Sequence, residues 1–184
     1  MLRPLPSWDL GQTWATFTKG TFHTEIAGVE VQKSGYDLAR YQELVEDSAP
    51  DLVIETGTRA GGSALYFHRV LGLEVITIDI APAFQKIGSP RAEPPYQGPG
   101  IAWLRGSSIS DNTIRQVLPM VGDKRVMVSL DSDHHSAHVQ AEIATWAPFV
   151  TPGCYLVVED ACFDLFHRAG QPVWARVGGS KMPE

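Results

Sequence analysis

Short apolar runs alternate with helical stretches along most of this chain, and that alternation limits its fold more than any other feature. The helical patterns lie at residues 62–71, 110–120 and 136–147, and a further one, with Asp37 as a candidate cap, ends before Pro50. The apolar runs lie at residues 52–54, 75–80, 101–104, 126–130 and 155–158. Strands alternating with helices of this length predict βαβ units, hence an α/β fold with a mainly parallel sheet covered by helices on both faces.

The two ends of the chain do not continue this pattern. We expect residues 1–36 to form an N-terminal arm with one short helix, on the substrate side of the molecule or at an oligomer contact. Residues 37–184 are expected to form the single main domain, and residues 81–100, rich in proline and glycine, a long surface loop. No convincing strand follows Asp160. The sheet therefore stops at five strands, is completed by another subunit, or belongs to a chain cut short.

Charge and composition exclude some partners. A net charge of −6 and a pI near 5.5 give no long-range attraction for nucleic acid or an anionic membrane. The sequence shows neither a membrane-spanning apolar stretch nor the apolar core of a secretion signal, so we expect a cytoplasmic protein with a small-molecule partner. Cys154 and Cys162 are expected to be reduced thiols.

Residues 55–63, ETGTRAGGS, predict a glycine-rich turn between the first strand and its helix. In a parallel sheet, such a turn commonly binds a nucleotide-like ligand. The dinucleotide pattern fails here because Arg59 stands where the middle glycine belongs. The phosphate-binding loop fails because Ser63 stands where its lysine belongs. The ligand of this turn is therefore expected to lack a phosphate group.

Acidic residues end the first two strands, Glu55 in the glycine-rich turn and Asp79 in VITIDI. Carboxylates suit a ligand with a cationic amino group and ribose hydroxyls, because both are hydrogen-bond donors. This arrangement is similar to the first motif of S-adenosylmethionine-dependent methyltransferases.

Two further acidic clusters follow strands whose ends meet at the same edge of the sheet. The first comprises Asp131 and Asp133, followed at once by His134 and His135, and the second is Glu159-Asp160. Carboxylates gathered in this way favour a divalent ion such as Mg²⁺, Mn²⁺ or Ca²⁺, and a histidine beside them can act as a base near neutral pH. The alternative is that these acids are solvated or cap helices, as Asp133 would at the helix near residue 136.

Together these motifs resemble the cephalosporin hydroxylase and rhamnosyl O-methyltransferase family, over about residues 25 to 162. The resemblance implies a Rossmann-like class I methyltransferase with a Mg²⁺-type ion beside S-adenosylmethionine. Many members of the family act on sugars or other parts of antibiotics and natural products. The family pattern continues with a further helix and two more strands, for which this chain has no room.

The resemblance also implies roles for individual residues. The cofactor's amino acid end falls near Glu55, Gly57 and Ser63, within a turn that also contains Thr58, Arg59 and Gly61. Its ribose falls at Asp79 and its adenine near Ser107 and Ser108. The metal falls to Asp133, Glu159 and Asp160, with Asp131 as the competing first ligand and a further cofactor contact. The catalytic group is His134 or His135, together with Asp133.

The resulting hypothesis is methyl transfer to a hydroxyl oxygen of a sugar or antibiotic-type molecule, by a homo-oligomer that uses S-adenosylmethionine and Mg²⁺ or another divalent cation. Two alternatives are left open. One is N-methylation of an amino sugar, and the other is a cofactor-binding accessory protein without turnover.

Overall fold

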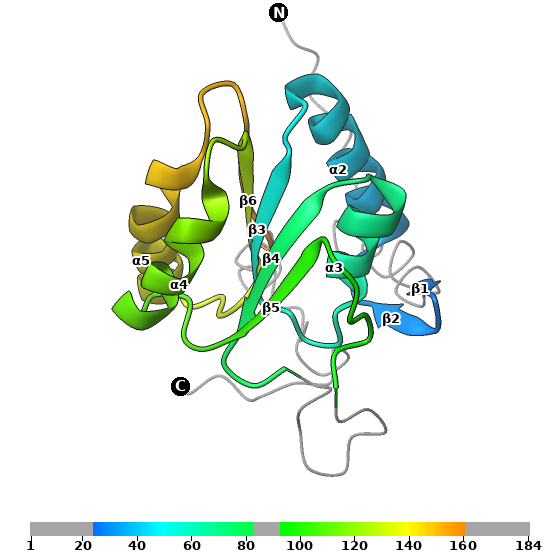
Figure 1. Ribbon diagram of the computed structural model, residues 1–184, viewed down its shortest axis with the longest axis horizontal. Helices are drawn as coiled ribbons and strands as arrows, with labels where there is room; N and C mark the ends of the chain where they lie inside the picture. The colour runs from blue at the N-terminus through cyan, green and yellow to red at the C-terminus, as the bar shows by residue number, and fades with distance from the viewer. Residues whose placement is uncertain (1–23, 83–92, 161–184) are drawn as a thin grey trace, which may run out of the picture.

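The computed structural model describes residues 24–82 and 93–160, which build a parallel sheet with helices on both faces (Figure 1). The order of the five strands across the sheet is β5-β4-β3-β6-β7. The strands are β3 (Leu52–Thr56), β4 (Glu74–Asp79), β5 (Ile101–Arg105), β6 (Val126–Leu130) and β7 (Leu156–Val158). The helices are α2 (Gly35–Ser48), α3 (Gly62–Leu65), the π-helical turn η1 (Tyr66–Val70), α4 (Asp111–Val121), α5 (Ser136–Trp146) and the 3-10 turn η3 (Ala147–Phe149). The predicted doubly covered parallel sheet is confirmed.

The register of the strands brings their carboxyl ends to one edge. Thr56 at the end of β3 pairs with Ile78 of β4 on one side and with Leu130 of β6 on the other. Leu130 in turn pairs with Val158, the last residue of β7. The residues that follow β3, β6 and β7 therefore emerge side by side, as the sequence predicted for the glycine turn and the acidic clusters.

The continuous apolar runs are explained by burial on both faces of the sheet. Along β3, Val53 belongs to the core beneath α2 and α3, whereas Leu52 and Ile54 belong to the core beneath α4 and α5. Figure 1 shows the two pairs of helices on opposite sides of the sheet. Because successive strand residues point to opposite faces, each run supplies both cores at once.

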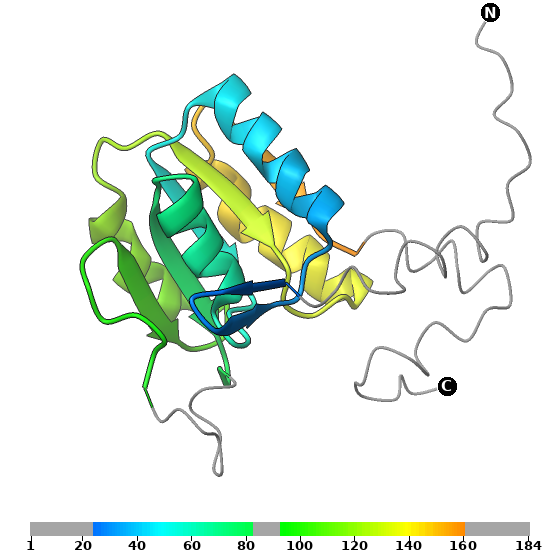
Figure 2. The same ribbon diagram turned by 90° about the vertical axis from the view of Figure 1, so that its right-hand side faces the viewer.

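Residues 24–31 form a small hairpin in which β1 (Thr24–Ile26) pairs antiparallel with β2 (Val29–Val31). The hairpin packs against α3, beside the turn that leaves β3 (Figure 2). The sequence predicted an arm with one short helix in residues 1–36; a hairpin occupies its described part, and residues 1–23 lie outside the described residues. The division of the chain at residue 36 stays a prediction.

Two predicted helices differ in detail. The helix α2 begins at Gly35, and its N-cap is Ser34 rather than Asp37; Asp37 closes the capping box by accepting from the Ser34 backbone. The single helix predicted for residues 62–71 is an α-helical turn followed by the π-helical turn η1. Side-chain periodicity alone does not distinguish these hydrogen-bonding patterns.

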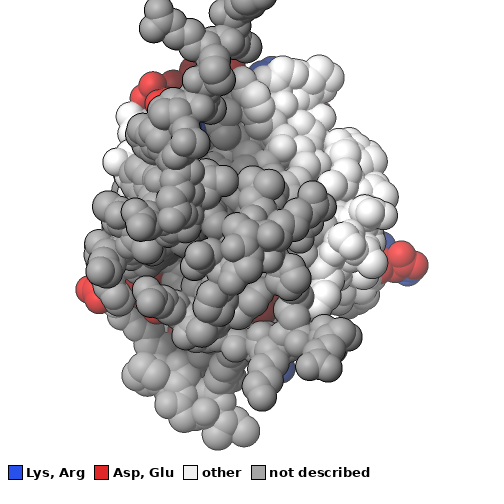
Figure 3. All heavy atoms as spheres, turned by 180° about the vertical axis from the view of Figure 1, so that it is seen from behind, with Lys and Arg blue, Asp and Glu red and all other residues white. Residues whose placement is uncertain are grey.

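On the side seen in Figure 3, the described residues that are visible show charged side chains at scattered places. There, acidic and basic side chains of the described residues appear as small separate groups, without a continuous basic surface. No helix in the described ranges is both long and apolar enough to cross a membrane. Cys154 is a free, half-buried thiol, and Cys162 lies outside the described residues.

Gly62 is expected to be essential for the position of the hairpin. A Cβ at Gly62 would lie 2.1 Å from the carbonyl oxygen of Glu30, and backbone atoms cannot swing away as a flexible side chain can. Gly62→Ala should therefore lower the free energy of unfolding by about 1–3 kcal/mol, as overpacking does. Urea unfolding followed by circular dichroism measures this loss.

Gly35→Ala is the matched control for that substitution. Gly35 is also the first residue of a helix, and nothing lies within 4 Å of a Cβ built there. Alanine at this position should leave stability equal or slightly higher. Equal effects of the two substitutions would contradict the close contact between hairpin and turn.

Candidate active site

The turn after β3 is packed tightly against neighbouring chain segments. Gly57 donates its N–H to Ile78 O at 2.8 Å, and a Cβ on Gly57 would lie 1.8 Å from the carbonyl oxygen of Asp131. Gly57 and Gly61 have φ values of 90° and 89°, which L side chains rarely adopt. A Cβ on Gly61 would meet the ring of Trp103 at 2.8 Å. The sequence predicted that this turn binds a ligand; the space beside the Cα atoms of these two glycines is filled by the protein itself.

Glu55 is fully buried at the end of β3. Its Oε2 accepts a hydrogen bond from Thr77 Oγ1 at 2.6 Å, whereas its Oε1 has no hydrogen-bond partner among the described residues. Burial raises the pKa of Glu55 to about 7, against the opposing effects of Lys33, Ser63 and Thr77. A buried carboxylate oxygen without a partner is rare in folded proteins. It fits a ligand that brings a cationic hydrogen-bond donor into the turn.

Asp79 is held by backbone donors at the end of β4. Its Oδ2 accepts from the N–H of Arg59 at 2.8 Å, and its Oδ1 accepts from the N–H of Ala81 at 2.7 Å. Arg59 has a positive φ of 46°, and its side chain is exposed. Thr58, on the same turn, is buried and hydrogen-bonded to Thr77 through its hydroxyl. The β3 turn thus orients the Asp79 carboxylate, which keeps acceptor capacity for ligand hydroxyls.

Ser108, predicted near adenine, is buried and takes part in a polar network with α5. Its hydroxyl lies 3.3 Å from His138 Nε2, which also lies 3.2 Å from Ser132 Oγ. Ser132 donates to the buried Glu142 at 2.7 Å. The neighbouring Ser107 is half-buried. A buried glutamate on α5 was not predicted, because in the sequence Glu142 looks like an ordinary helix-surface residue.

Three side chains at the ends of β6 and β7 form a group that could hold a metal ion. One ligand atom from each of Asp131, His134 and Asp160 lies within 4.8 Å of the others. His134 Nε2 is 3.3 Å from Asp160 Oδ2 and 4.0 Å from Asp131 Oδ1. Burial raises the pKa values of both carboxyls, and their proximity adds to the rise at Asp160. Two carboxylates and an imidazole in this arrangement suit a divalent cation.

The other two predicted metal residues lie outside this group. Glu159 Oε1 accepts from Lys33 Nζ at 2.9 Å and also from the hydroxyl of Tyr41. Asp133 is exposed, and its Oδ1 accepts from both the backbone N–H and the ring Nδ1 of His135. The backbone hydrogen bond from His135 lowers the pKa of Asp133. Asp133 does not cap α5, whose N-cap is His135.

Lys33 is a residue of this site that the sequence analysis missed. Its side chain is only 3% exposed, and its Nζ lies 2.6 Å from Asp131 Oδ2. It precedes α2 by two residues, in a stretch predicted as part of the N-terminal arm. A lone lysine in such a segment has no local sequence signal, because its partners Asp131 and Glu159 are about a hundred residues away.

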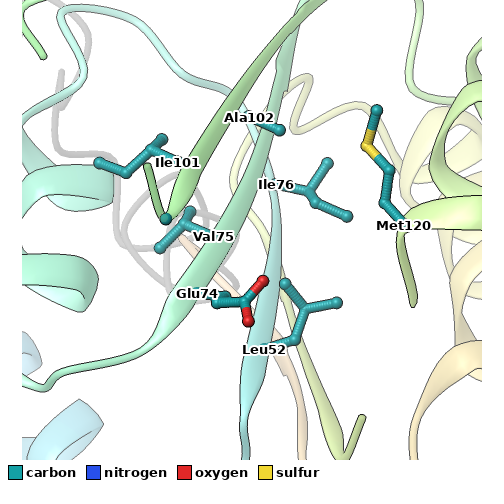
Figure 4. A pocket seen from close by; sticks show the side chains of 8 residues that line it. Leu52, Glu74, Val75, Ile76, Ile101, Ala102 and Met120 are labelled. Atoms are coloured by element: carbon teal, nitrogen blue, oxygen red, sulfur yellow. The ribbon is translucent and has the colours of Figure 1, made fainter. Parts of the chain in front are cut away.

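A separate cavity of about 240 Å³ lies at the opposite edge of the sheet. It is lined by residues at the starts of β3, β4 and β5, including Leu52 and Ile76, and by Met120 of α4 (Figure 4). The carboxylates described above follow the other ends of the strands, so this cavity is not part of the candidate active site.

A family model described as "Rhamnosyl O-methyltransferase/CmcI" matches residues 18–180. The chain belongs to this family. Curated relatives in the rhamnosyl O-methyltransferase/CmcI family include rhamnosyl O-methyltransferases of Mycobacterium tuberculosis and Mycobacterium leprae. The first is 34% identical over 75% of this chain and 57% of its own length. The second is 32% identical over 84% of this chain and 66% of its own length. The chain thus spans roughly three fifths of the curated relatives that it matches.

Solved structures agree with the fold. CmcI solved with Mg and SAM has a TM-score of 0.58 and 18% identity, over 92% of this chain and 73% of CmcI. The methyltransferase MycE of the mycinamycin pathway, solved with Mg and SAH, has a TM-score of 0.52 and 20% identity, over 72% of this chain and 34% of MycE. The predicted Rossmann-like class I methyltransferase fold is confirmed. The site residues named above remain predictions.

Glu55→Gln is expected to change how stability depends on pH. Because the pKa of Glu55 is raised to about 7 from 4.5, the folded protein binds more protons than the unfolded chain between these pH values, and wild-type stability falls as pH rises through that range. The variant lacks this titration. Without added cofactor, it should gain up to about 3 kcal/mol relative to wild type above pH 7.

Urea unfolding at pH 5 and pH 8 measures this difference, and the exposed Glu25→Gln controls for the loss of a carboxyl group. A stability difference between Glu55→Gln and wild type that does not grow with pH would contradict the buried, desolvated state of Glu55.

Proposed function

We propose that this chain is a divalent-metal-dependent O-methyltransferase that uses S-adenosylmethionine and acts on a hydroxyl of a sugar or natural-product molecule. The observation that carries the proposal is the position of the Asp131, His134 and Asp160 group at the strand edge that also holds the glycine turn of β3. Membership of the rhamnosyl O-methyltransferase/CmcI family supports it, as do neighbours of known structure solved with Mg and with SAM or SAH.

The residues of the β3 and β4 turns fit the cofactor. Glu55 Oε1, buried and without a hydrogen-bond partner among the described residues, would accept from the amino group of S-adenosylmethionine. Asp79 would accept from the ribose hydroxyls, since backbone N–H groups already fix its orientation. Ser63 lies in the first turn of α3 and would lie beside the amino acid end of the cofactor. Ser107 and Ser108 would lie near adenine.

The two carboxylates of the Asp131, His134 and Asp160 group suit a Mg²⁺-type ion, which prefers oxygen ligands. When bound, the cofactor supplies the methyl group and the ion supplies Lewis acidity that lowers the pKa of the acceptor hydroxyl. Asp131 and Asp160 would hold the ion through carboxylate oxygens. Residues that would hold the ion and the cofactor lie at neighbouring strand ends, and alignment of two reacting groups in an enzyme can contribute about 7 kcal/mol or more.

The Asp133–His135 pair provides a general base. His135 is largely exposed, and its Nδ1 contacts Asp133 Oδ1, which leaves Nε2 to accept the proton of the acceptor hydroxyl. Asp133 orients the ring by this contact, as a carboxylate orients the histidine of other acid–base pairs. His134 is the second candidate base, because its ring lies between Asp131 and Asp160. In such a transfer the acceptor oxygen would gain the methyl group as the bond from carbon to sulfur breaks, and the histidine would take the hydroxyl proton.

The finer parts of this proposal concern the methyl acceptor, the biosynthetic pathway, the localisation and the oligomeric state. The names of the curated relatives favour a rhamnosyl or similar deoxysugar hydroxyl. The neighbour MycE, from the mycinamycin pathway, favours a place in antibiotic biosynthesis. Cytoplasmic localisation and a homo-oligomeric state stay predictions.

The test of this function is formation of S-adenosylhomocysteine from S-adenosylmethionine, with Mg²⁺ and a panel of rhamnosyl glycosides, amino sugars and macrolides. We expect turnover only with a hydroxylated acceptor and only with a divalent ion. Full activity in excess chelator would contradict the metal's role. Methylation of amino sugars alone would favour the N-methyltransferase alternative, and cofactor binding without turnover on any acceptor would favour an accessory protein.

Substitutions should separate the metal ligands from the base. Asp160→Asn is expected to weaken Mg²⁺ binding at least about tenfold, because the site loses one of two carboxylate ligands. Asp133→Asn should leave Mg²⁺ binding within about threefold of wild type, since Asp133 stands outside the ligand group. Isothermal titration calorimetry measures both. Strong loss of Mg²⁺ binding in Asp133→Asn would restore Asp133 to the ligand set.

His135→Gln should lower turnover about 100-fold or more while Mg²⁺ binding is kept, as expected for a base that is not a ligand. His134→Gln should weaken Mg²⁺ binding as well. Calorimetry and S-adenosylhomocysteine formation, measured on the same preparations, distinguish the two histidines. The reverse pattern would assign the base to His134.

A further inference from the structure

A polar network joins the loops after β5 and β6 to helix α5. Ser108 follows β5, Ser132 follows β6, and both hydroxyl oxygens approach Nε2 of His138 on α5, at 3.3 Å and 3.2 Å. Glu142, one helical turn further along α5, is only 1% exposed, and its Oε1 lies 3.5 Å from the same nitrogen. In the sheet, β3 and β4 lie between β5 and β6. The network therefore spans the ends of the two strands that lead into the proposed cofactor turns.

The loop that carries Ser108 is anchored at both ends. Gly106 donates its N–H to Asp79 O at 3.0 Å, which ties the start of the loop to the end of β4. Ser110 caps α4 through its side chain, and its N–H donates to Ser107 O at 3.1 Å. Between these anchors Ser108 is buried. Its hydroxyl is thus held on a fixed loop, tied to the strand whose final carboxylate is proposed to bind the ribose.

The hydrogen bonds of this network have a defined direction. The Ser132 hydroxyl donates its hydrogen to the Glu142 carboxylate at 2.7 Å, so towards His138 it can only accept. The nitrogen Nε2 of His138 therefore carries a hydrogen, and the nearby carboxylate favours the same tautomer. With a hydrogen on Nε2, the Ser108 oxygen also accepts from His138. The hydroxyl hydrogen of Ser108 is then available to a different acceptor.

We propose that His138 is a positioning residue for the cofactor base, which fixes the Ser108 hydroxyl as a hydrogen-bond donor. Adenine offers two kinds of polar group, ring nitrogens that accept hydrogen bonds and an exocyclic amino group that donates them. A Ser108 hydroxyl that donates selects a ring nitrogen of adenine and not the amino group. This inference rests on the proposed function, because it assigns a contact at the adenine end of the same cofactor site.

The first test compares S-adenosylhomocysteine with four analogues, by titration calorimetry without metal or methyl acceptor. Three analogues have CH in place of one ring nitrogen, N1, N3 or N7, and the fourth lacks the amino group. Wild type should bind at least one of the three ring analogues about threefold to tenfold more weakly than S-adenosylhomocysteine, as expected for one lost hydrogen bond. Ser108→Ala should bind that analogue and S-adenosylhomocysteine alike, and should keep the wild-type response to loss of the amino group.

Two substitutions of His138 separate a positioning role from a merely structural one. In His138→Gln the side-chain amide nitrogen can take the place of Nε2, whereas in His138→Asn the shorter amide reaches only the place of Nδ1. His138→Gln should therefore keep the wild-type preference for the ring nitrogen, and His138→Asn should lose most of it. Gln140→Asn is the matched control, because Gln140 is an exposed residue of the same helix. It should bind every analogue as wild type does.

The possible results distinguish this inference from the proposed function. Ser108→Ala that keeps the ring-nitrogen preference, or that loses the response to the amino group instead, would overturn the inference. Equal preferences in His138→Gln and His138→Asn would also overturn it, because packing alone would then position the serine. If His138→Asn does not fold, His138→Phe, which keeps a ring without nitrogens, takes its place with the same expected loss. A wild-type protein that does not bind S-adenosylhomocysteine would overturn the proposed cofactor site itself, and this inference with it.

Discussion

Repulsion between carboxylates at one edge of the sheet is the constraint on which the rest of this site depends. The parallel register of β3, β6 and β7 brings Glu55, Asp131 and Glu159 to neighbouring positions. Such side chains are costly to bury together unless cations or hydrogen bonds offset their charge. Here burial raises the pKa values of Glu55 and Asp131, and Lys33 opposes both shifts. Lys33 therefore balances part of the negative charge at this edge, and the rest is available to a cationic ligand.

The hairpin β1–β2 links this balance to the fold. Its strand β2 packs over Gly62, where a Cβ would collide with the Glu30 backbone, and the chain that leaves β2 brings Lys33 to Asp131 and Glu159, which follow β6 and β7. A segment that looks like a lead-in to the main domain is therefore part of the site. Two glycines of the β3 turn similarly serve protein packing, with Gly57 against Asp131 and Gly61 against Trp103.

Membership of the rhamnosyl O-methyltransferase/CmcI family and the geometry of the candidate active site independently support the same kind of reaction. The fold places a glycine turn, a strand-end aspartate and a group that could hold a metal ion along one edge, where the proposed methyl transfer to a hydroxyl would use them. Asp133 contacts the ring of His135, which is the candidate base in the proposed reaction. None of these features by itself identifies an acceptor, because one fold can carry sites for many different substrates.

Local patterns were enough to predict the alternating strands and helices, the parallel sheet and the gathering of Glu55, Asp79, Asp131 and Asp160 at its carboxyl edge. Those features depend on the spacing of apolar residues and on the shared direction of parallel strands, and both follow from local sequence patterns. The sequence could not predict which carboxylates face one another. Asp131 and Asp133 are both close to the end of β6, yet the backbone turns Asp131 toward Asp160 and Asp133 toward His135.

The sequence by itself determined the fold class and the acidic character of the site, because both follow from residue types at regular spacings. Only the tertiary structure decided that the carboxylate of Glu159 pairs with Lys33. The physical reason is distance along the chain. Lys33 and Glu159 are 126 residues apart, so their contact depends on how the hairpin, α2 and the last strand pack together. No local spacing of residues indicates that packing.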